Sequence, residues 1–289
     1  MLLGDNPFFG VDHLSQERAR QKAAASKNFD NALDVIEYSN DLGIKGMVVS
    51  THPELKELIE RMRAKSNLIK KIEFYPILPY AQGYVSKINE KGLMNTLMET
   101  LNQGGFRNIV KIITKGSLGV IRKDLFKLFR VFIDIELLQL TNTKINTVFL
   151  HNVITDLALS SNMKNIFETF QEHLHDNYKL NSGLVTLNLP RLIYKLNEWG
   201  LYFSDIMAPF NSVGFQMNPS RQECENCLTS FKGNIIAMSI LAGGYLEPSD
   251  AYKYILTQPK IKKVVIGVSS IDHAKKTFGL FLKPNTNND

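Results

Sequence analysis

Short apolar runs alternate with amphipathic helical stretches along nearly the whole of this 289-residue chain. Neighbouring candidate strands lie about 20 to 35 residues apart, mostly with a helical pattern between them. This spacing is typical of repeated βαβ units, in which consecutive strands lie parallel in one sheet. The alternation therefore predicts an α/β protein built on a parallel sheet.

A closed barrel is the arrangement that we favour for this sheet. Nine segments have strand composition, one more than an eight-stranded barrel uses: residues 2–9, 45–50, 73–78, 107–113, 147–150, 184–187, 205–210, 235–239 and 263–266. The run 107–113 is the weakest, because it could equally open a helix. One such barrel takes about 250 residues, so we expect a single (β/α)8 TIM barrel over 1–284 and a polar tail over 285–289. A doubly wound open sheet is the alternative, but no Gly-rich dinucleotide motif follows an early strand.

Helical spacing accounts for most of the remaining chain. Helices are expected over residues 29–42, 53–65, 91–102, 123–140, 166–174, 191–199, 222–231 and 248–257, and from residue 272 onward. Several begin or end at residues that commonly cap helices, such as Pro53 at a start and Gly43 at an end.

The charge balance is mildly basic, with 34 Lys and Arg against 28 Asp and Glu, a net charge of +6. The basic clusters are short pairs, such as Lys70-Lys71, so we expect no nucleic-acid partner and favour a small anionic ligand. Asp5 and Asn6 come too early for a signal peptide, and no apolar run reaches the about 18 residues of a membrane span. We therefore expect a cytoplasmic protein with no membrane partner.

The two cysteines, Cys224 and Cys227, are separated by two residues in a polar helical stretch. A zinc site would need a second pair of ligands at suitable spacing, and a redox pair would open a helix after a strand. We therefore expect two reduced thiols one helical turn apart.

The residues from Ile235 to Phe278, which include LAGG and VVIGVSS, resemble the seventh and eighth strands of the aldo-keto reductases. In that family the turn after the eighth strand and the following helix hold the phosphate of a nicotinamide cofactor. The resemblance implies that Gly267, Ser269 and Ser270 bind NADP, and Asn188 is a further candidate cofactor contact. A helix start with two hydroxyl groups suits an anion, although Ser270 could also simply cap the last helix.

The remainder of the family's catalytic set matches less well. His151, in Leu150-His151-Asn152, matches the family histidine that orients the substrate carbonyl. The family's aspartate and tyrosine are absent, because Val49-Ser50-Thr51-His52 stands at the second strand and Leu55 falls at the tyrosine place. The family's lysine also lacks a counterpart, since the third strand ends in Ile77-Leu78-Pro79-Tyr80. A reductase of this kind would need a different proton donor.

Polar side chains at the carboxyl ends of the strands supply further candidates, because barrel enzymes place their active residues there. These are Asp5, Asn6, Asp12, His13, Ser50, Thr51, His52, Tyr80, Gln82, His151, Asn152, Asn188, Asn211, Gln216, Asn218, Ser269 and Ser270. From them we select catalytic candidates and substrate-binding candidates. The catalytic candidates are Asp12, His13, His52, Tyr80 and His151, and the substrate-binding candidates are Asn6, Asn152 and Asn218.

Three functions remain open on this basis. The leading one is a divergent aldo-keto-reductase-like enzyme that acts on a small polar or phosphorylated metabolite with NADP, with Tyr80 or His52 as proton donor. The second is a metal-dependent hydrolase, lyase or isomerase, in which His13, His52 and His151 bind a divalent ion with Asp12. The third is a barrel that binds a ligand without catalysis.

Overall fold

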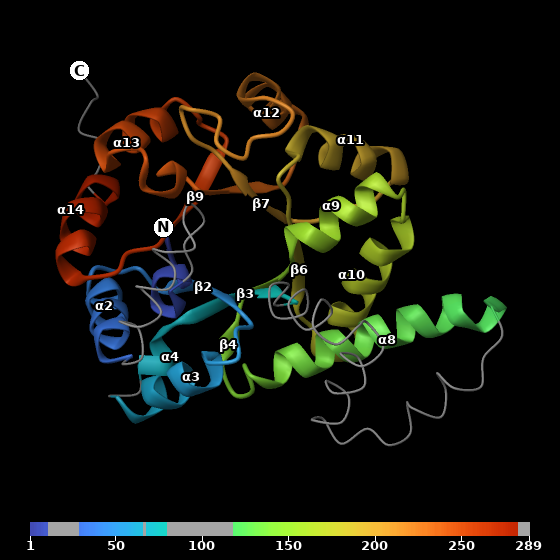
Figure 1. Cartoon of the computed structure of the whole chain (residues 1–289), viewed down its shortest axis with the longest axis horizontal. Helices are drawn as coiled ribbons and strands as arrows, with labels where there is room; N and C mark the ends of the chain where they lie inside the picture. Colours follow the sequence, from blue (N-terminus) through green and yellow to red (C-terminus); the bar gives the residue numbers. More distant parts are fainter. Residues whose placement is uncertain (11–28, 66–67, 80–117, 283–289) are drawn as a thin grey trace.

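The computed structural model describes residues 1–10, 29–65, 68–79 and 118–282. Eight of its strands form a closed parallel barrel (Figure 1). They are β1 (Leu2–Gly4), β2 (Gly46–Ser50), β3 (Glu73–Leu78), β5 (Thr147–Leu150), β6 (Asn181–Val185), β7 (Asp205–Pro209), β8 (Asn234–Met238) and β9 (Ile261–Ile266). The fold is a single (β/α)8 TIM barrel, which confirms the sequence expectation.

The ring closes through pairings at β1 and β2. β1 lies between β9 and β2, and β2 also pairs with β3 in parallel. β3 pairs directly with β5, and the short β4 (Lys144–Ile145) pairs with the start of β3. The ninth candidate strand, 107–113, lies outside the described residues, as do the predicted helix 91–102 and the tail 285–289.

Helices surround the barrel (Figure 1). They are α2 (Asp30–Asp41), α3 (Leu55–Ala64), α4 (Leu68–Lys71), α8 (Leu118–Leu138), α9 (Asn152–Ser160), α10 (Lys164–Tyr178), α11 (Leu189–Trp199), α12 (Arg221–Cys227), α13 (Pro248–Leu256) and α14 (Ile271–Phe281). Three short 3₁₀ helices accompany them: η1 (Asn6–Phe9), η2 (Leu228–Ser230) and η3 (Ala242–Gly244). Sequence analysis did not predict α4 or α9.

Two predicted strands were misplaced. The strand expected over 2–9 ends at Gly4, and the chain then turns into η1, where Pro7 near the helix start has no N–H to offer a sheet. The strand expected over 184–187 instead runs from Asn181 to Val185. The next residue, Thr186, uses its hydroxyl to bond Asp156 on α9.

The barrel interior is a packed core rather than a channel. Seven buried side chains fill it: Leu2, Val48, Tyr75, Phe149, Val185, Met207 and Ile236. Gly183 leaves room for the Phe149 ring, because a Cβ there would lie 2.5 Å from a ring carbon. A larger cluster fills the space between the strands and the helices. A ligand must therefore bind at one end of the barrel.

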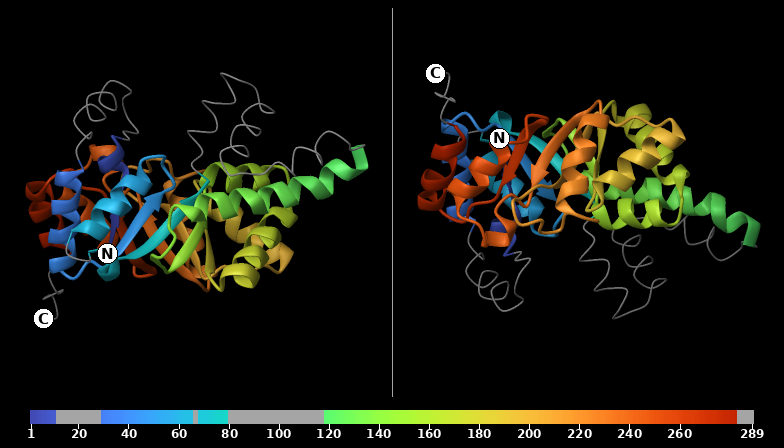
Figure 2. Two further views of the ribbon diagram at one scale, coloured as in Figure 1. Left: turned by 90° about the horizontal axis from the view of Figure 1, so that it is seen from below. Right: turned by 90° about the horizontal axis from the view of Figure 1, so that it is seen from above.

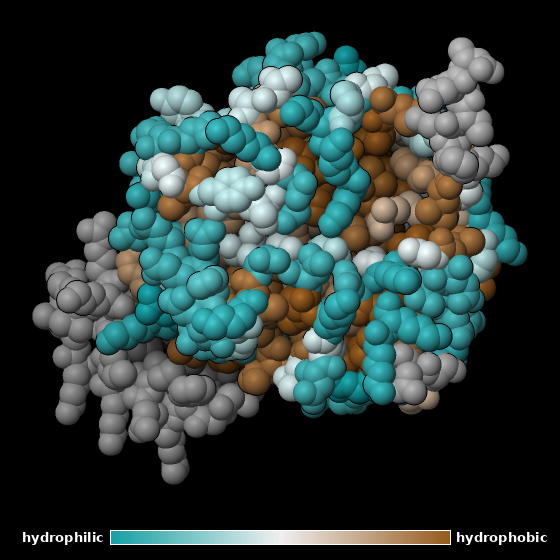
Figure 3. Space-filling model, turned by 180° about the vertical axis from the view of Figure 1, so that it is seen from behind, coloured by the Kyte–Doolittle hydropathy of each residue, from teal (hydrophilic) through white to brown (hydrophobic). Residues whose placement is uncertain are grey.

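The two ends of the barrel differ in what they present. We call the end formed by the carboxyl termini of the strands the mouth, and the opposite end the amino-terminal face. In Figure 2 the N-terminus lies at the amino-terminal face and η1, in dark blue, lies at the mouth. Figure 3, seen from behind relative to Figure 1, shows the amino-terminal face.

Candidate active site

A buried carboxyl group lies at the end of β1. Asp5 is only 4% exposed, and its Oδ2 accepts hydrogen bonds from the Ser50 backbone N–H at 2.7 Å and the Ser50 hydroxyl at 2.9 Å. Burial raises the pKa of Asp5 to about 7, although the hydrogen bonds from Ser50 oppose the rise. Asp5 therefore exchanges its proton near neutral pH.

The side chain of Ser50 connects this carboxyl group with the barrel interior. Ser50 follows Val48 by two residues on β2, and Val48 faces the interior. Side chains alternate along a strand, so Ser50 faces the same side at the mouth. Asp5 and Ser50 thus form a carboxyl–hydroxyl pair whose hydroxyl lies nearer the mouth.

His151 has a fixed tautomer at the end of β5. It is the N-cap of α9, and its Nδ1 accepts a hydrogen bond from the Val153 backbone N–H at 3.1 Å. Because Nδ1 accepts, the proton of the neutral ring lies on Nε2. Burial lowers the pKa of His151 to about 4. The mouth therefore holds a neutral imidazole with an Nε2–H donor.

His52 has a similar arrangement after β2. Its Nδ1 accepts from the Glu54 backbone N–H at 3.2 Å, and its ring stacks on Phe9 with 4.7 Å between centroids. Burial lowers the pKa of His52, and the nearby carboxylate of Glu54 opposes this. His52 is therefore neutral at physiological pH, which makes it a weak proton donor.

A half-buried carboxyl group, that of Asp156, organises the end of β6. Asp156 on α9 accepts from the Thr186 hydroxyl at 2.5 Å and from the Leu187 backbone N–H at 3.0 Å. Burial raises the pKa of Asp156. The Thr186 hydroxyl also accepts from the backbone N–H of Asn188, whose own side chain caps α11 through the Arg191 N–H. The predicted cofactor contact Asn188 thus has a capping role at the mouth.

The turn after β9 joins α14 to α2. Ser270 is the N-cap of α14 and accepts from the His273 backbone N–H at 3.3 Å. The Ser269 hydroxyl lies 3.0 Å from His273 Nδ1, and its carbonyl accepts from the Asn31 side chain at 2.6 Å. A Cβ at Gly267 would lie 2.9 Å from the Pro7 ring. The three predicted phosphate contacts therefore form one ordered turn at a helix start.

The remaining predicted residues divide into two groups. Asn6 begins η1, Asn152 begins α9 and both are half-buried at the mouth, whereas the Asn218 side chain is exposed. The backbone N–H of Asn218 bonds the carbonyl of Leu187, which anchors its loop beside β6. Asp12, His13 and Tyr80 lie outside the described residues.

His52 and His151 do not suit a divalent metal. Within the ranges that the structure describes, no cluster of three potential ligands occurs. A histidine that binds metal through Nε2 usually donates its Nδ1–H to a neighbouring acceptor. In His52 and His151, Nδ1 instead accepts a backbone N–H. If Nε2 bound a metal, the ring proton would lie on Nδ1. In both histidines it would then point at the backbone N–H that Nδ1 now accepts.

The two cysteines form no disulfide, and their thiols bond backbone carbonyls. Both thiols are free, and Cys224 Sγ bonds the carbonyl of Asn218 while Cys227 Sγ bonds that of Cys224. Burial raises the pKa of Cys224 to about 11 and that of Cys227 to about 12. The thiols therefore stay protonated at neutral pH, as expected of unreactive cysteines.

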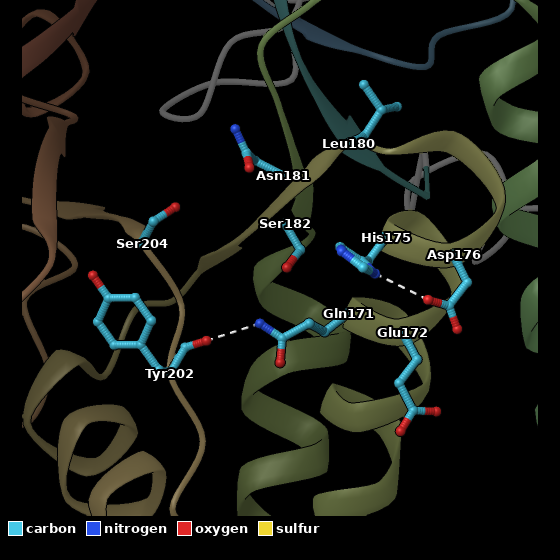
Figure 4. Close-up of a pocket in the computed structure, with 9 residues that line it drawn as sticks. All are labelled: Gln171, Glu172, His175, Asp176, Leu180, Asn181, Ser182, Tyr202 and Ser204. Carbon is cyan, nitrogen blue, oxygen red and sulfur yellow. Dashed lines mark hydrogen bonds and ion pairs between the residues drawn. The ribbon is translucent and has the colours of Figure 1, made fainter.

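Two hollows formed by described residues lie at the amino-terminal face rather than at the mouth. One, of about 390 Å³, lies beside α10 and the starts of β6 and β7 (Figure 4). Polar groups that line it bond to one another. The Gln171 side chain donates to the Tyr202 carbonyl at 2.8 Å, and His175 Nδ1 lies 2.9 Å from Asp176 Oδ1. The other, of about 450 Å³, is lined mainly by lysines.

Sequence analysis placed Asp5 at the mouth without giving it a role, and it did not find Asp156. A raised pKa depends on burial, and burial of Asp5 depends on η1 folding back over the strand end. The one sequence signal for Asp5 is its position directly after the apolar run of β1. Asp156 carries no such signal, because it lies within a helix that the sequence pattern did not reveal.

No helix in the part of the chain that the structure describes is both long and apolar enough to cross a bilayer.

No family model and no curated protein sequence matches the chain. Several solved structures, in contrast, match the fold of this chain. An aldo-keto reductase from Pseudomonas aeruginosa superposes with a TM-score of 0.59 and 13% identity, covering 97% of this chain and 90% of that one.

Two further structures agree. The aldo-keto reductase AKR11C1 from Bacillus halodurans, in its holo form, gives a TM-score of 0.58 at 12% identity, covering 98% of this chain and 87% of that one. The thermostable aldo-keto reductase Tm1743, in complex with the inhibitor epalrestat, gives 0.56 at 9% identity, covering 99% and 91%. The chain therefore has an aldo-keto-reductase-like (β/α)8 barrel.

Proposed function

We propose that the protein is an oxidoreductase that reduces the carbonyl group of a small polar or phosphorylated metabolite with NADPH. The observation that carries the proposal is His151, a neutral imidazole whose Nε2–H is left as the donor at the mouth. A neutral imidazole can donate a hydrogen bond from its N–H to the substrate carbonyl oxygen. It thereby polarises the carbonyl group while keeping its own proton. The aldo-keto-reductase-like fold supports the same reaction class.

The turn at Gly267, Ser269 and Ser270 suits the phosphate of a nicotinamide cofactor. Helix α14 begins there, and a helix start attracts anions through its free N–H groups and dipole. The absence of a side chain at Gly267 lets the turn pack against Pro7. The cofactor supplies a hydride when bound, and Asn188 is the proposed contact beside β6.

We assign the missing proton donor to Asp5, acting through Ser50. When Asp5 is protonated, its hydroxyl donates to Ser50 Oγ, and the Ser50 hydroxyl is then free to donate toward the mouth. The 2.9 Å separation of Ser50 Oγ from Asp5 Oδ2 supports this relay. Tyr80 remains an alternative donor, whereas the capped Nδ1 and lowered pKa of His52 make it the weaker one. Asn6, Asn152 and Asn218 are the proposed substrate contacts.

Calorimetric titration with NADPH tests the cofactor site. We expect binding in about the micromolar range, weakened at least about tenfold when both Ser269 and Ser270 are changed to Asp. Aspartate keeps the N-cap of α14 and adds negative charge, so the loss would report on the anion rather than on the helix. Ser249→Asp with Ser230→Asp adds the same charge at exposed serines elsewhere and should leave binding unchanged.

The absence of NADPH binding at about millimolar concentration would contradict the proposal. It would leave a ligand-binding barrel without nicotinamide chemistry as the better description. Binding that survives the double aspartate variant would keep the oxidoreductase but move the cofactor phosphate away from this turn.

A further inference from the structure

The lysine-lined hollow at the amino-terminal face lies far from the strand ends that the reductase proposal uses. It is formed where β2, β3 and β4 begin, with the ends of α2 and α4 beside them. Its lining residues are Asn40, Lys45, Lys70, Lys71, Glu73 and Lys144. Its volume, about 450 Å³, is that of a small-molecule site.

The charges in this hollow do not cancel. Glu73 is already neutralised, because its carboxylate lies 2.5 Å from Lys144 Nζ and accepts from Asn146 at 3.2 Å. The hydrogen bond and charge of Lys144 lower the pKa of Glu73, so the pair stays ionised. Lys45, Lys70 and Lys71 have no carboxylate within ion-pair distance among the described residues. Three ammonium groups around this hollow therefore have no carboxylate partner in the part of the chain that the structure describes.

Many other lysines in the described ranges are paired. Lys65 contacts Asp34 at 2.7 Å, and Lys276 contacts Glu247 at 3.1 Å. Like charges gathered around a hollow repel one another. Cations near helix C-termini are stabilised only modestly, so the ends of α2 and α4 explain only part of the arrangement. On this face Figure 3 shows hydrophilic residues around recessed hydrophobic ones.

We propose that this hollow binds a small molecule carrying a diphosphate or longer phosphate chain. Lysine ammonium groups are compact point charges that bind phosphate oxygens without demanding a fixed orientation. The three positive charges match the negative charge of a diphosphate. A single phosphate or carboxylate group carries too little charge to neutralise them. Asn40 also lines the hollow and has a side-chain amide that can hydrogen-bond a phosphate oxygen. This site is separate from the proposed cofactor turn and does not depend on the reductase assignment.

Calorimetric titration with inorganic pyrophosphate, at about 50 mM salt so that screening is limited, tests the proposal. We expect Lys70→Ala with Lys71→Ala to weaken binding at least about tenfold. The matched control is Lys275→Ala with Lys276→Ala, which removes the same charge from ion-paired lysines on α14 and should change affinity less than about twofold. Lys45→Glu should weaken binding to the same degree. Because Lys45 lies outside α4, this variant tests the site even if the double alanine variant disturbs that helix.

The mouth must be excluded as the binding place, because the turn at Ser269 and Ser270 is also a proposed phosphate site. The double aspartate variant of that turn should bind pyrophosphate as the unaltered protein does. Comparison with ADP identifies the source of the phosphate chain: tighter binding of ADP indicates a nucleotide, and equal binding indicates the phosphate chain alone.

Three results would overturn the proposal. One is no heat of binding up to about 10 mM pyrophosphate. Another is an equal loss in the Lys275 and Lys276 control, which would show attraction by net charge alone. The third is a loss confined to the Ser269 and Ser270 variant, which would place the anion at the mouth.

Discussion

At the scale of single residues, Asp5 couples the mouth to solution pH. Its carboxyl group is buried and accepts hydrogen bonds from the Ser50 hydroxyl and from the backbone N–H groups of Ser50 and Asp5. Within the described residues no lysine or arginine pairs with it. Its pKa rises from 3.8 unfolded to about 7 folded. Below the lower value both states are protonated, so burial of the group costs nothing extra there. Between the two values only the unfolded state ionises, so stability falls as pH rises.

We therefore expect Asp5→Asn to raise the free energy of unfolding at pH 8 and to leave it nearly unchanged at pH 4. A difference of three pKa units corresponds to about 4 kcal/mol, an order-of-magnitude figure. Urea denaturation of both proteins at the two pH values measures it. Ser50→Ala, which removes one hydrogen bond to the carboxylate, should raise the folded pKa of Asp5 and so extend the upper end of the pH-dependent range. A stability difference that is the same at both pH values would show that Asp5 titrates normally.

His151 has two separable tasks, capping α9 through Nδ1 and presenting Nε2–H to a ligand. Asparagine is a good N-cap and alanine is not, so His151→Ala should lower the free energy of unfolding by about 1 kcal/mol relative to His151→Asn. Both variants should lose carbonyl reduction, because both lack Nε2. Equal stability of the two would argue against the cap, and retained activity in His151→Asn would argue against the carbonyl role.

At the scale of elements, two glycines near the end of the chain have opposite reasons to be there. A Cβ at Gly267 would lie 2.9 Å and 3.0 Å from two Pro7 ring atoms, whereas no atom of the described residues lies within 4 Å of a Cβ at Gly279 on α14. Gly267→Ala should destabilise the protein by about 1 to 3 kcal/mol through overpacking. Gly279→Ala should stabilise it by about 0.5 to 1 kcal/mol through helix propensity. Thermal denaturation of both variants tests the contrast, and shifts of the same sign would contradict it.

The accuracy of the sequence predictions also varies by element. Helices such as α11 and α13 were predicted closely because Pro, Gly and the apolar period mark their ends. α9 was missed because its exposed face carries Val153 and Leu157, which blur the amphipathic pattern. β1 was predicted too long, since the apolar residues Phe8 and Phe9 continue its pattern into η1.

At the scale of the whole molecule, the repeated βαβ spacing predicted the parallel sheet, and the lack of a Gly-rich dinucleotide motif after an early strand favoured a barrel over an open sheet. The site was less predictable, because its chemistry depends on contacts between strand ends far apart in sequence. The Asp5–Ser50 bond joins residues 45 positions apart, and no local pattern announces it. The capped nitrogen of His151, which fixes the tautomer, is likewise visible only once α9 is known to begin at Asn152.

The pairing of β1 with both β9 and β2 has a consequence for how the chain is made. The residue partners of Leu2 and Leu3 on β9 are Val265 and Ile266, which leave the ribosome among the last residues described. Until β9 is made, β1 has an open edge with unpaired backbone groups. The three-residue length of β1 keeps the edge short, which limits how well a neighbouring chain could pair with it.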